Sequence, residues 1–475
     1  MKKISILVFL LFAGIAFSQN YSYYNDKKQP LELSKKSINI FVTNQFVPPP
    51  NNPVFSNVVF KLNELTPNEK WATLRFANEL SDVAYYQKIN ELKNLPHVTG
   101  VGKHFKNGAY PTVGTSNLFY IKLKQASDYS VLVQMAQQNK VSIHHQLEYM
   151  PLWYALVRQP DAINDALELS NMFYETTYFA NVDPAFVFEI SMMIPDPEET
   201  YFCSLDNSNN LPSCSNDPAF DLQWGLKNYS NEAVDINACQ AWNIATGQGV
   251  KIAIHDNGTL LTHTDLVANL SPLSFNVATG TSPSVLSTQQ PDHGTFVAGI
   301  CGASQNNNLG ITGVAPNSTL ISISNPSGYN ALTYCEKQAL GINWAWKTPV
   351  NADIINCSWG IHAAMPVLYP EFLEDAIDDA TTLGRQGKGC IVVFASGNDA
   401  YGMRYPANNP NLNLLTVGAI TPTGEKPFFS AFGNTLDLVA PGVCITSTAA
   451  NGAITEEEGT SFAAPHVAGV AALML

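Results

Sequence analysis

The chain has 475 residues, of which 45% are hydrophobic and 13% are charged, so it is long enough for two or three domains with large buried cores. This composition excludes global disorder. The net charge is −14, and most of it lies after residue 220, which disfavours nucleic acid and anionic membrane surfaces as main partners.

The first residues have the pattern of a secretory signal peptide. A basic start at residues 2–3 precedes an apolar run at 4–15, and residues 16–18 have the small-x-small form of a cleavage site. The run is too short to span a membrane, and no other segment is long and apolar enough. We expect residues 1–18 to be removed and the protein to be secreted, with no membrane span.

Residues 19–110 alternate short apolar runs with polar turns. The runs INIFV (38–42), VVFKL (58–62) and TLRF (73–76) predict strands. The stretch PHVTGVGKHF (96–105) reads as a loop.

Residues 117–186 have a more regular pattern, in the order β-α-β-β-α-β. The second helix is expected within 161–176, starting at an Asp cap and placing Ile163 on its apolar face. This order is typical of the split, ferredoxin-like arrangement. The expected segments are NLFYIKL (117–123), SDYSVLVQMAQQ (127–138), VSIHHQLEYM (141–150), LWYALVRQ (152–159), DAINDALELSNMFYET (161–176) and FANVDPAFVF (179–188).

Residues 187–219 are rich in Pro, Asn, Ser and acidic residues, which predicts a linker that is open to proteolysis. The eight cysteines are even in number, and Cys203 and Cys214 would close a short loop here. Cys301, Cys357 and Cys390 fall in apolar segments and are expected to be buried core residues.

From about residue 220 the chain alternates strands and helices. Apolar, β-branched runs of buried-strand type alternate with segments of helical character, which predicts a doubly wound α/β fold with a parallel sheet and helices on both faces. The expected strands are VKIAIHD (250–256), TLISIS (319–324), ADIINCS (352–358), GCIVVFAS (389–396) and LLTVGAI (414–420), and the expected helices start at 293, 334 and 371.

Three short stretches of this region supply an acid, a base and a hydroxyl. Asp256 ends a strand, whereas His293 and Ser461 stand at predicted helix starts. A serine hydroxyl is a weak nucleophile and needs a base that a third group orients. Taken singly, a Ser before an apolar helix is usually a cap, and a lone Asp or His is usually structural.

Together, the stretches DNG, HGTFVAG and GTSFAAPHVAG resemble the motifs of the subtilisin-like serine proteases, in the order Asp, His, Ser. The resemblance covers about residues 220–475. It implies a secreted serine endopeptidase that acts on polypeptides through an acyl-enzyme. It also implies that residues 19–200 are a propeptide whose ferredoxin-like part, 117–186, inhibits the enzyme until it is cleaved off within 187–219.

The resemblance also implies the residues that bind substrate. Asn398, in the stretch ASGN, would donate a hydrogen bond to the oxyanion. Asn257 follows the catalytic Asp and would form a hydrogen bond near its carboxylate. Arg404 falls near the expected pocket floor, where it would either favour acidic side chains or pair with Asp399 at the surface. The two expected walls of the primary pocket are Ser358, Trp359 and Gly360 on one side and Ala395, Ser396 and Gly397 on the other.

A structural calcium site is a further expectation from the resemblance. LTHTDL places Asp265 where the family binds calcium. The loop GASQNNNLGITGVAP would add the Asn307 side chain and the carbonyls of Gln305, Leu309 and Ile311. The alternative is a polar loop without an ion.

Two other functions compete with the protease. One is a secreted binding protein on an inactive subtilisin fold, which need not keep the triad. The other is an α/β-hydrolase esterase, which would need a GxSxG elbow that the chain lacks. Only fourteen residues follow Ser461, so we expect the natural chain to continue beyond Leu475.

Overall fold

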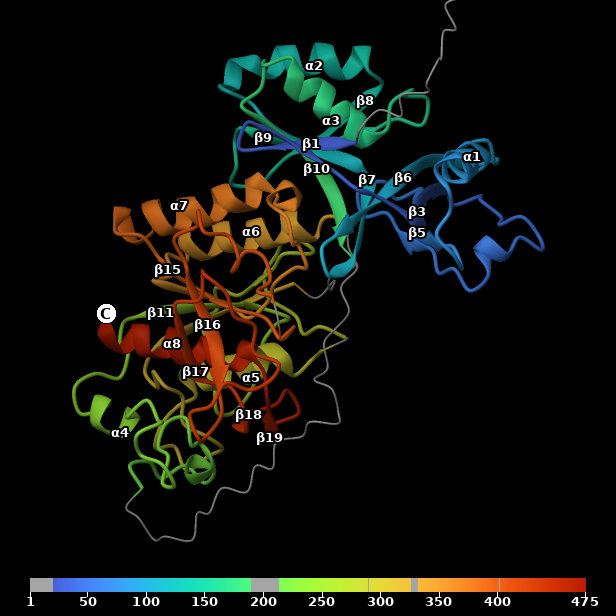
Figure 1. The fold of residues 1–475 in the computed structure, drawn as a ribbon. Coiled ribbons are helices and arrows are strands. Elements are labelled where there is room, and N and C mark those ends of the chain that lie inside the picture. The colour runs from blue at the N-terminus through green and yellow to red at the C-terminus, as the bar shows by residue number, and fades with distance from the viewer. Residues whose placement is uncertain (1–19, 189–212, 289, 326–331, 401) are drawn as a thin grey trace, which may run out of the picture.

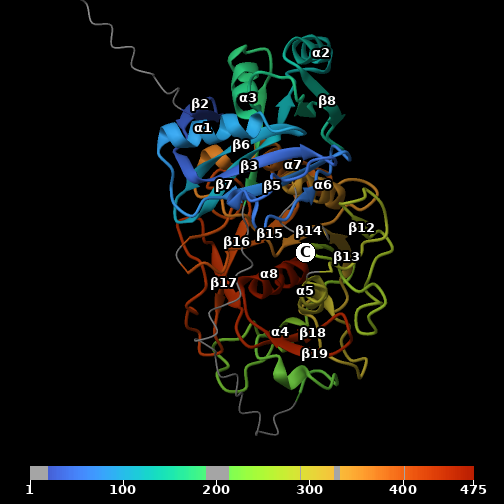
Figure 2. The same ribbon diagram turned by 90° about the vertical axis from the view of Figure 1, so that its right-hand side faces the viewer.

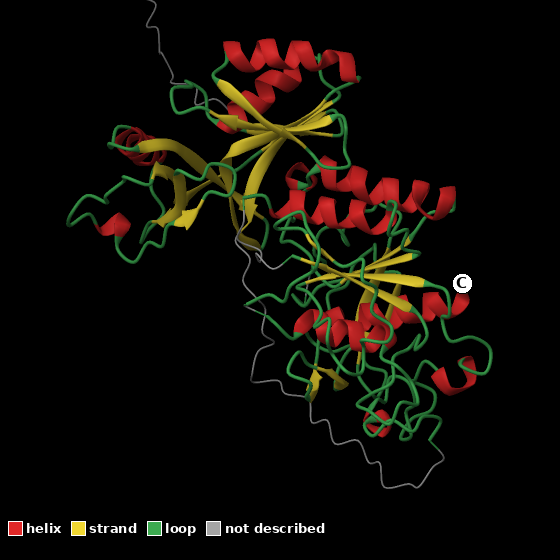
Figure 3. Cartoon of the chain, turned by 180° about the vertical axis from the view of Figure 1, so that it is seen from behind, coloured by secondary structure: helices red, strands yellow, loops and turns green. Residues whose placement is uncertain are grey.

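The computed structural model describes residues 20–188, 213–288, 290–325, 332–400 and 402–475. The predicted signal peptide and most of the predicted linker lie outside these ranges. Within them, the two large sheets alternate with three layers of helices (Figures 1 and 3). Helices α6 and α7 lie between the N-terminal sheet and the C-terminal parallel sheet.

The C-terminal region is built on a seven-stranded parallel sheet of order β12-β13-β11-β14-β15-β16-β17. After β11 the chain adds β12 and β13 on one side of this strand and then adds β14 to β17 on its other side. Strand β11 therefore lies at the switch point of a doubly wound sheet. The predicted fold class and all five predicted strands are confirmed. The strands are β11 (Lys251–Asp256), β12 (Phe275–Asn276), β13 (Thr319–Ser324), β14 (Ile354–Cys357), β15 (Ile391–Ala395), β16 (Leu415–Ile420) and β17 (Leu438–Pro441).

Helices cover both faces of this sheet. On one face α5 packs against α8, and on the other α6 packs against α7. The strands between them are buried because both faces are covered, which explains their continuous apolar sequence. The bounds are α4 (Ala238–Ala241), α5 (His293–Gly302), α6 (Tyr334–Trp346), α7 (Glu371–Gly387) and α8 (Thr460–Met474), with a hairpin of β18 (Ile445–Thr448) and β19 (Ile454–Glu457).

The predicted β-α-β-β-α-β order of residues 117–186 is confirmed. Its strands pair antiparallel in the order β10-β7-β9-β8. The second helix starts later than predicted, because Asp165 rather than Asp161 caps it, in a reciprocal capping box with Glu168. Ile163 is therefore exposed, not on the apolar face. The elements are β7 (Tyr110–Lys122), α2 (Tyr129–Gln138), β8 (Val141–Gln146), β9 (Trp153–Arg158), α3 (Ala166–Glu175) and β10 (Asn181–Phe188).

Residues 20–107 extend this sheet beyond β7. The prediction of a loop at 96–105 was wrong, because this stretch forms β6, which pairs with both β3 and β7. The strand predicted at 58–62 is reduced to two residues in β4. The elements are β1 (Tyr21–Tyr24), β2 (Lys27–Pro30), β3 (Leu33–Thr43), β4 (Lys61–Leu62), β5 (Glu69–Arg75), α1 (Asp82–Lys93) and β6 (Val98–Asn107).

The N-terminal sheet rests on α6 and α7 (Figure 2). One cluster of buried apolar side chains crosses the boundary between them. The Tyr120 and Trp153 rings contact Phe372 of α7 with centroid distances of 4.4 and 5.8 Å. Asp375 of α7 accepts from Trp153 Nε1 at 2.7 Å and from Lys122 Nζ at 2.6 Å. The contact therefore combines buried apolar surface with hydrogen bonds that fix the position of the sheet on α7.

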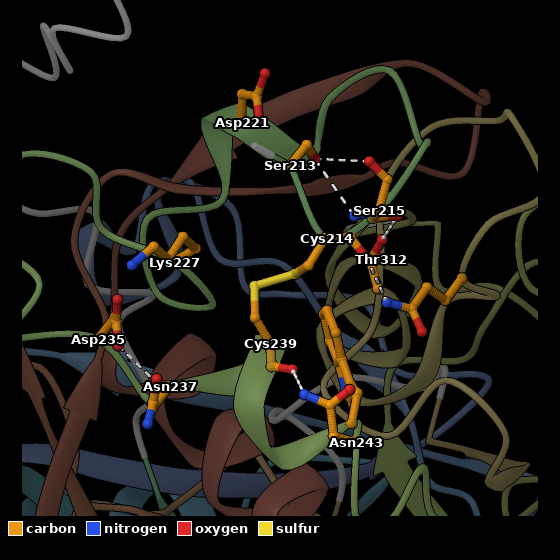
Figure 4. Close-up of a disulfide and its surroundings, with 12 residues drawn as sticks. Ser213, Cys214, Ser215, Asp221, Lys227, Asp235, Asn237, Cys239, Asn243 and Thr312 are labelled. Atoms are coloured by element: carbon orange, nitrogen blue, oxygen red, sulfur yellow. Dashed lines mark hydrogen bonds between the residues drawn. A yellow bond between two sulfur atoms is a disulfide. The ribbon is translucent and has the colours of Figure 1, made fainter. Parts of the chain in front are cut away.

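A disulfide ties the end of the predicted linker to the C-terminal region. Cys214 pairs with Cys239, not with Cys203 as the sequence suggested (Figure 4). Residues 213–219 therefore belong to the C-terminal region. The linker was predicted to extend to residue 219, which is too far. Cys301, Cys357 and Cys390 are free and buried, as predicted. Among the described residues, no helix combines the length and the apolar character that crossing a bilayer requires.

Candidate active site

The four predicted catalytic residues gather at the carboxyl edge of the parallel sheet. Asp256 is the last residue of β11, and Asn398 follows β15. His293 is the first residue of α5, and Ser461 is the second residue of α8. Strand ends and helix starts meet at this edge, and β11 marks the switch point, so the topology assembles the site from segments that are far apart in sequence.

Asp256 binds the imidazole of His293 directly. Its Oδ1 lies 2.7 Å from His293 Nδ1 and also accepts the Asn257 backbone N–H at 2.6 Å. The Asn257 side chain does not bond near the carboxylate as predicted, because it donates to Gln290 Oε1 at 2.8 Å. The backbone, not the side chain, of Asn257 therefore supports the acid.

The pKa of His293 is raised above the ordinary histidine value. Burial by itself lowers this pKa, but the charge and the hydrogen bond of Asp256, together with the more distant charge of Glu457, outweigh it. The Asp256 carboxylate thus makes the imidazole a stronger base and stabilises the imidazolium that a proton transfer would form.

Ser461 is held by a reciprocal pair of bonds with Ser358. Pro465 has no N–H, so the Ser461 carbonyl has no helical partner four residues on. The Ser358 hydroxyl donates to that carbonyl at 2.7 Å, and the Ser461 hydroxyl donates to the Ser358 carbonyl at 3.2 Å. The proline in GTSFAAPHVAG thereby frees an acceptor through which the β14 end fixes the serine.

The residue after Ser461 packs its ring against the imidazole of the predicted base. The ring of Phe462 lies 5.5 Å from the imidazole of His293 and 4.5 Å from Phe296, between centroids. The hydrogen bonds of the described residues do not include one from Ser461 Oγ to His293. In enzymes without substrate such bonds are often long and tighten in the Michaelis complex.

Replacing Ser358 with alanine is expected to lower both kcat and the melting temperature. The Ser461 carbonyl would lose its donor, which costs about 1–3 kcal/mol when the acceptor is buried. Misplacement of the nucleophile is expected to lower kcat by about 10- to 100-fold. Ser358→Thr keeps the hydroxyl and is expected to restore most of both. Equal kcat values for the two variants would contradict a role of this hydroxyl.

Asn398 is oriented by the residue before the serine. Its Oδ1 accepts from the Thr460 backbone N–H at 2.9 Å and from the Thr460 hydroxyl at 2.8 Å. Thr460 Oγ1 in turn accepts the Gly397 N–H at 3.1 Å. With Oδ1 fixed in this way, the amide nitrogen Nδ2 makes no hydrogen bond to another described residue and is available as a donor. Thr460 was not among the predicted site residues, although the GTS motif contains it.

The two expected pocket walls stand on either side of Arg404. A Cβ built on Gly360 would lie 2.8 Å from Arg404 Cβ, and one built on Gly397 would lie 3.0 Å from Arg404 Cγ. Trp359 turns its ring inward against Phe394, at 5.0 Å between centroids, so it offers a substrate only its backbone. Ala395 and Ser396 are buried, and Ser396 donates to the Ala431 carbonyl at 3.0 Å.

Arg404 is paired with Asp399, which was one of the two alternatives. Its Nε and a terminal guanidinium nitrogen lie 2.7 and 3.2 Å from the two carboxylate oxygens. The pair is mostly buried rather than on the surface. Burial by itself raises the pKa of Asp399, but bonds from His362 and Arg404 hold it below its usual value. The charge of Arg404 is therefore balanced within the protein.

The predicted calcium loop folds around Asp265. Its two carboxylate oxygens accept from Asn307 Nδ2 at 2.8 Å and from the Ile311 N–H at 2.9 Å. Gly310 has φ +37°, and a Cβ there would lie 2.4 Å from Asp265 Oδ2, so the close approach of the loop requires glycine. Burial, and secondly the charge of Asp217, raise the pKa of Asp265, while the hydrogen bonds from Ile311 and Asn307 lower it.

Two side chains of the predicted calcium loop form hydrogen bonds within the protein. Gln305 directs its side chain to the Cys214 carbonyl at 3.4 Å, and Asn307 Oδ1 accepts the Leu309 N–H at 2.8 Å. Within the described residues no group of three or more His, Cys, Asp or Glu is arranged for a metal. The donor types suit calcium, but the Asn307 amide would have to turn its oxygen towards Asp265.

Asp217 organises the same loop and was missed because it lies in the predicted linker. It accepts from the backbone N–H groups of Asn306 and Asn307 at 2.9 and 3.0 Å and from the Thr312 hydroxyl at 2.6 Å. The disulfide of Cys214 holds this segment in place. The only sign of it in the sequence is an acidic residue, Asp217, within the polar stretch SCSNDP.

The β6–β7 hairpin reaches the loop beside the pocket. Asn107 donates to the His362 carbonyl and accepts the Ala364 N–H at 2.9 Å. The ring of Tyr110 stacks on His362 with centroids 4.8 Å apart. His362 Nε2 lies 3.3 Å from Asp399 Oδ2, so the N-terminal region touches a partner of the pocket floor.

Comparison with known proteins agrees with this geometry. The model of the Subtilase family matches residues 247–475. The alkaline protease of Alkalihalobacillus alcalophilus is 31% identical over 361 residues, which cover 75% of this chain and 77% of the relative. Subtilisin Savinase of Lederbergia lenta is 37% identical over 235 residues, which cover 48% of this chain and 77% of the relative.

Among solved structures, fervidolysin from Fervidobacterium pennivorans, described as a keratinolytic enzyme related to subtilisin, shares the fold. It aligns with a TM-score of 0.57 and 22% identity over 78% of this chain and 55% of that chain. The sequence relatives and the parallel sheet lead to the same conclusion. The chain belongs to the subtilase family and is a serine-type endopeptidase.

Proposed function

We propose that this chain is a secreted zymogen of a serine endopeptidase that cleaves polypeptides through Asp256, His293 and Ser461. The observation that carries the proposal is the 2.7 Å bond from Asp256 to His293 Nδ1, beside a serine at a helix start. The bond leaves Nε2 of the imidazole to act as the base. No observation favours the alternative of an inactive binding protein.

Each residue has a defined part in the reaction. His293 takes the Ser461 proton as Oγ attacks the carbonyl carbon, and then gives it to the leaving amine. Asn398 Nδ2 donates to the oxyanion, where the N-terminus of α8 adds partial positive charge. A water activated by His293 then hydrolyses the acyl-enzyme. Ser358–Gly360 and 395–397 would hold the substrate chain on either side.

The N-terminal region is proposed to be an inhibitory propeptide, spanning about residues 19–200 after a signal peptide at 1–18. Its contact with α6 and α7 and the stacking of Tyr110 on His362 support this role. Because β10 extends to Phe188 and Cys214 is bound to Cys239, self-cleavage is expected between them. The mature chain would then begin between residues 189 and 213 and would keep the disulfide of Cys214.

The test is cleavage by the full chain of an unfolded protein substrate and of itself. The expressed wild type is expected to digest casein and to yield a mature N-terminus between residues 189 and 213. Ser461→Ala is expected to do neither. A mature start before residue 180, or equal activity of the two chains, would overturn the proposal.

A bound calcium ion is proposed to stabilise the loop around Asp265. The buried carboxylate, the Asn307 amide and the loop carbonyls of Gln305, Leu309 and Ile311 are the donors, and Asp217 adds negative charge beside them. With the Asn307 amide reversed, its oxygen would face Asp265 Oδ1, an arrangement that a cation would bridge. Calcium here would act in stability, not in the reaction.

Removal of calcium is expected to lower the melting temperature of the inactive Ser461→Ala chain. Calcium at 100 times its Kd adds about 2.7 kcal/mol of stability. For a domain of this size that corresponds to a shift of about 5–10 °C in Tm. Asp265→Asn is expected to remove the difference between samples with calcium and with chelator, whereas the exposed Glu425→Gln is expected to keep it. An unchanged Tm for Ser461→Ala with chelator would contradict the calcium site.

A further inference from the structure

The ends of β14 and β15 separate beside the proposed nucleophile. The two strands pair side by side within the sheet, and each continues past its carboxyl edge. The continuation of β14 carries Ser358, whose carbonyl accepts from the Ser461 hydroxyl, and the continuation of β15 carries Asn398. A substrate carbonyl held between Ser461 and Asn398 would therefore lie over the opening between residues 358–360 and 395–397. The side chain on the acyl side of the cleaved bond would enter this opening, which is the primary pocket.

A short backbone segment joins the two walls and forms the floor of this pocket. The Arg404 N–H donates to the Ser396 carbonyl of one wall at 3.0 Å. Tyr405 exchanges both backbone hydrogen bonds with Ile361, which follows the other wall, at 2.8 and 3.0 Å. The side chain of Arg404 therefore starts from the floor, between the two walls.

The aliphatic stem of Arg404 fills the space between the walls. A Cβ built on Gly360 would lie 2.8 Å from Arg404 Cβ and 3.5 Å from its Cδ, and one built on Gly397 would lie 3.0 Å from Cγ and 3.4 Å from Cδ. Carbon atoms pack best at about 3.5–4.0 Å, so the stem has room only because both wall positions are glycine. A long substrate side chain would have to occupy the same space.

The charged end of Arg404 is already used within the protein. Its Nε and a terminal nitrogen bond to the two oxygens of Asp399 at 2.7 and 3.2 Å, in the two-pronged geometry that suits a guanidinium group and a carboxylate. The two side chains are only 13% and 3% exposed, and His362 Nε2 lies 3.3 Å from the same carboxylate. A substrate carboxylate that took the guanidinium would leave Asp399 buried without this partner, which is unfavourable.

We propose that Arg404 restricts the residue before the cleaved bond to small uncharged side chains, such as those of alanine, serine and glycine. The stem of Arg404 excludes long side chains, and its pairing with Asp399 excludes acidic ones. This specificity rests on the proposed endopeptidase activity and narrows its substrates.

Peptide p-nitroanilides that differ only in the residue before the cleaved bond test the proposal. One methylene in an apolar pocket changes kcat/KM by about 10- to 200-fold, so the processed wild type is expected to prefer Ala over Phe and Glu by about 100-fold or more. Arg404→Ala combined with Asp399→Asn empties the pocket without leaving a buried carboxylate unpaired. In this double variant kcat/KM for the Phe peptide is expected to rise by about 100-fold.

Matched variants separate the volume of Arg404 from its charge. Arg404→Met with Asp399→Asn keeps an unbranched stem without the charge and is expected to keep the preference for Ala over Phe. Asp399→Asn alone leaves the guanidinium without its carboxylate and is expected to raise kcat/KM for the Glu peptide by about tenfold. Arg385 and Asp353 form another pair, 3.3 Å apart, at the amino edge of the sheet. Arg385→Ala with Asp353→Asn is expected to leave the preference unchanged.

Labelling of Ser461 with a fluorophosphonate probe counts the active sites in each sample. A labelled wild type that cleaves the Phe or Glu peptide as fast as the Ala peptide would overturn the specificity alone. Equal gains for Phe in the Ala and Met double variants would also overturn it, because volume would then not matter. A wild type that takes up no label and cleaves no peptide would instead contradict the proposed function. The wild-type preference decides the matter even where a variant does not fold.

Discussion

Asp256→Asn is expected to lower kcat by about 10⁴-fold while the fold is kept, the largest loss of any change at this site except that of the nucleophile. The carboxylate accepts from His293 Nδ1 at 2.7 Å, and an amide of the same shape would favour the wrong tautomer. Steady-state kinetics on a peptide substrate and the melting temperature measure the two effects separately. A loss below tenfold would contradict the role of Asp256.

The pH profile gives a second test of the same pair. Because Asp256 and Glu457 raise the pKa of His293, the base becomes neutral only above the ordinary histidine range, and kcat/KM is expected to rise with pH through that raised value. Glu457→Gln removes one raising charge without touching the tautomer. It is expected to move the acid limb to lower pH with little change of the plateau. A limb that stays in place or moves to higher pH would contradict the assignment.

Asn398→Asp is expected to lower kcat by about 10²–10³-fold with little change in KM, the loss known from removal of one oxyanion donor in a subtilisin. Aspartate keeps an oxygen that can accept from the Thr460 N–H and hydroxyl, at 2.9 and 2.8 Å, but it has no Nδ2 to donate. The change therefore separates donation to the oxyanion from the anchoring of Thr460.

A matched variant tests the anchoring itself. Thr460→Ala leaves the Asn398 amide in place but removes the hydroxyl that orients it, so a smaller loss of kcat is expected. If Asn398→Asp and Thr460→Ala lose equal amounts, the amide acts through the structure of the helix start rather than by donation.

Much of the fold followed from local sequence because the parallel strands are buried on both faces. Apolar β-branched runs such as TLISIS match β13 residue for residue, and the helix predicted from Tyr334 matches α6. Strand β6 was missed because it contains Gly100 and Gly102. A Cβ on Gly102 would lie 2.1 Å from the Thr115 carbonyl oxygen, so the glycine serves the close approach of β7, which sequence periodicity does not express.

Only the site residues that lie in recognisable sequence motifs could be predicted. Asp256, His293, Ser461 and Asn398 followed from family resemblance, and they meet at one sheet edge. The bond of Ser358 to the carbonyl that Pro465 leaves free joins residues more than a hundred positions apart, so no local pattern indicates it. The same holds for the contact of Tyr110 with His362.

The central claim is that Ser461 is an activated nucleophile. Its most direct test is labelling of the processed protein with a fluorophosphonate probe, followed by mapping of the modified peptide. We predict a single adduct on Ser461 that is absent in Ser461→Ala and strongly reduced in Asp256→Asn. No adduct on the processed wild type, or an adduct on another residue, would contradict the claim.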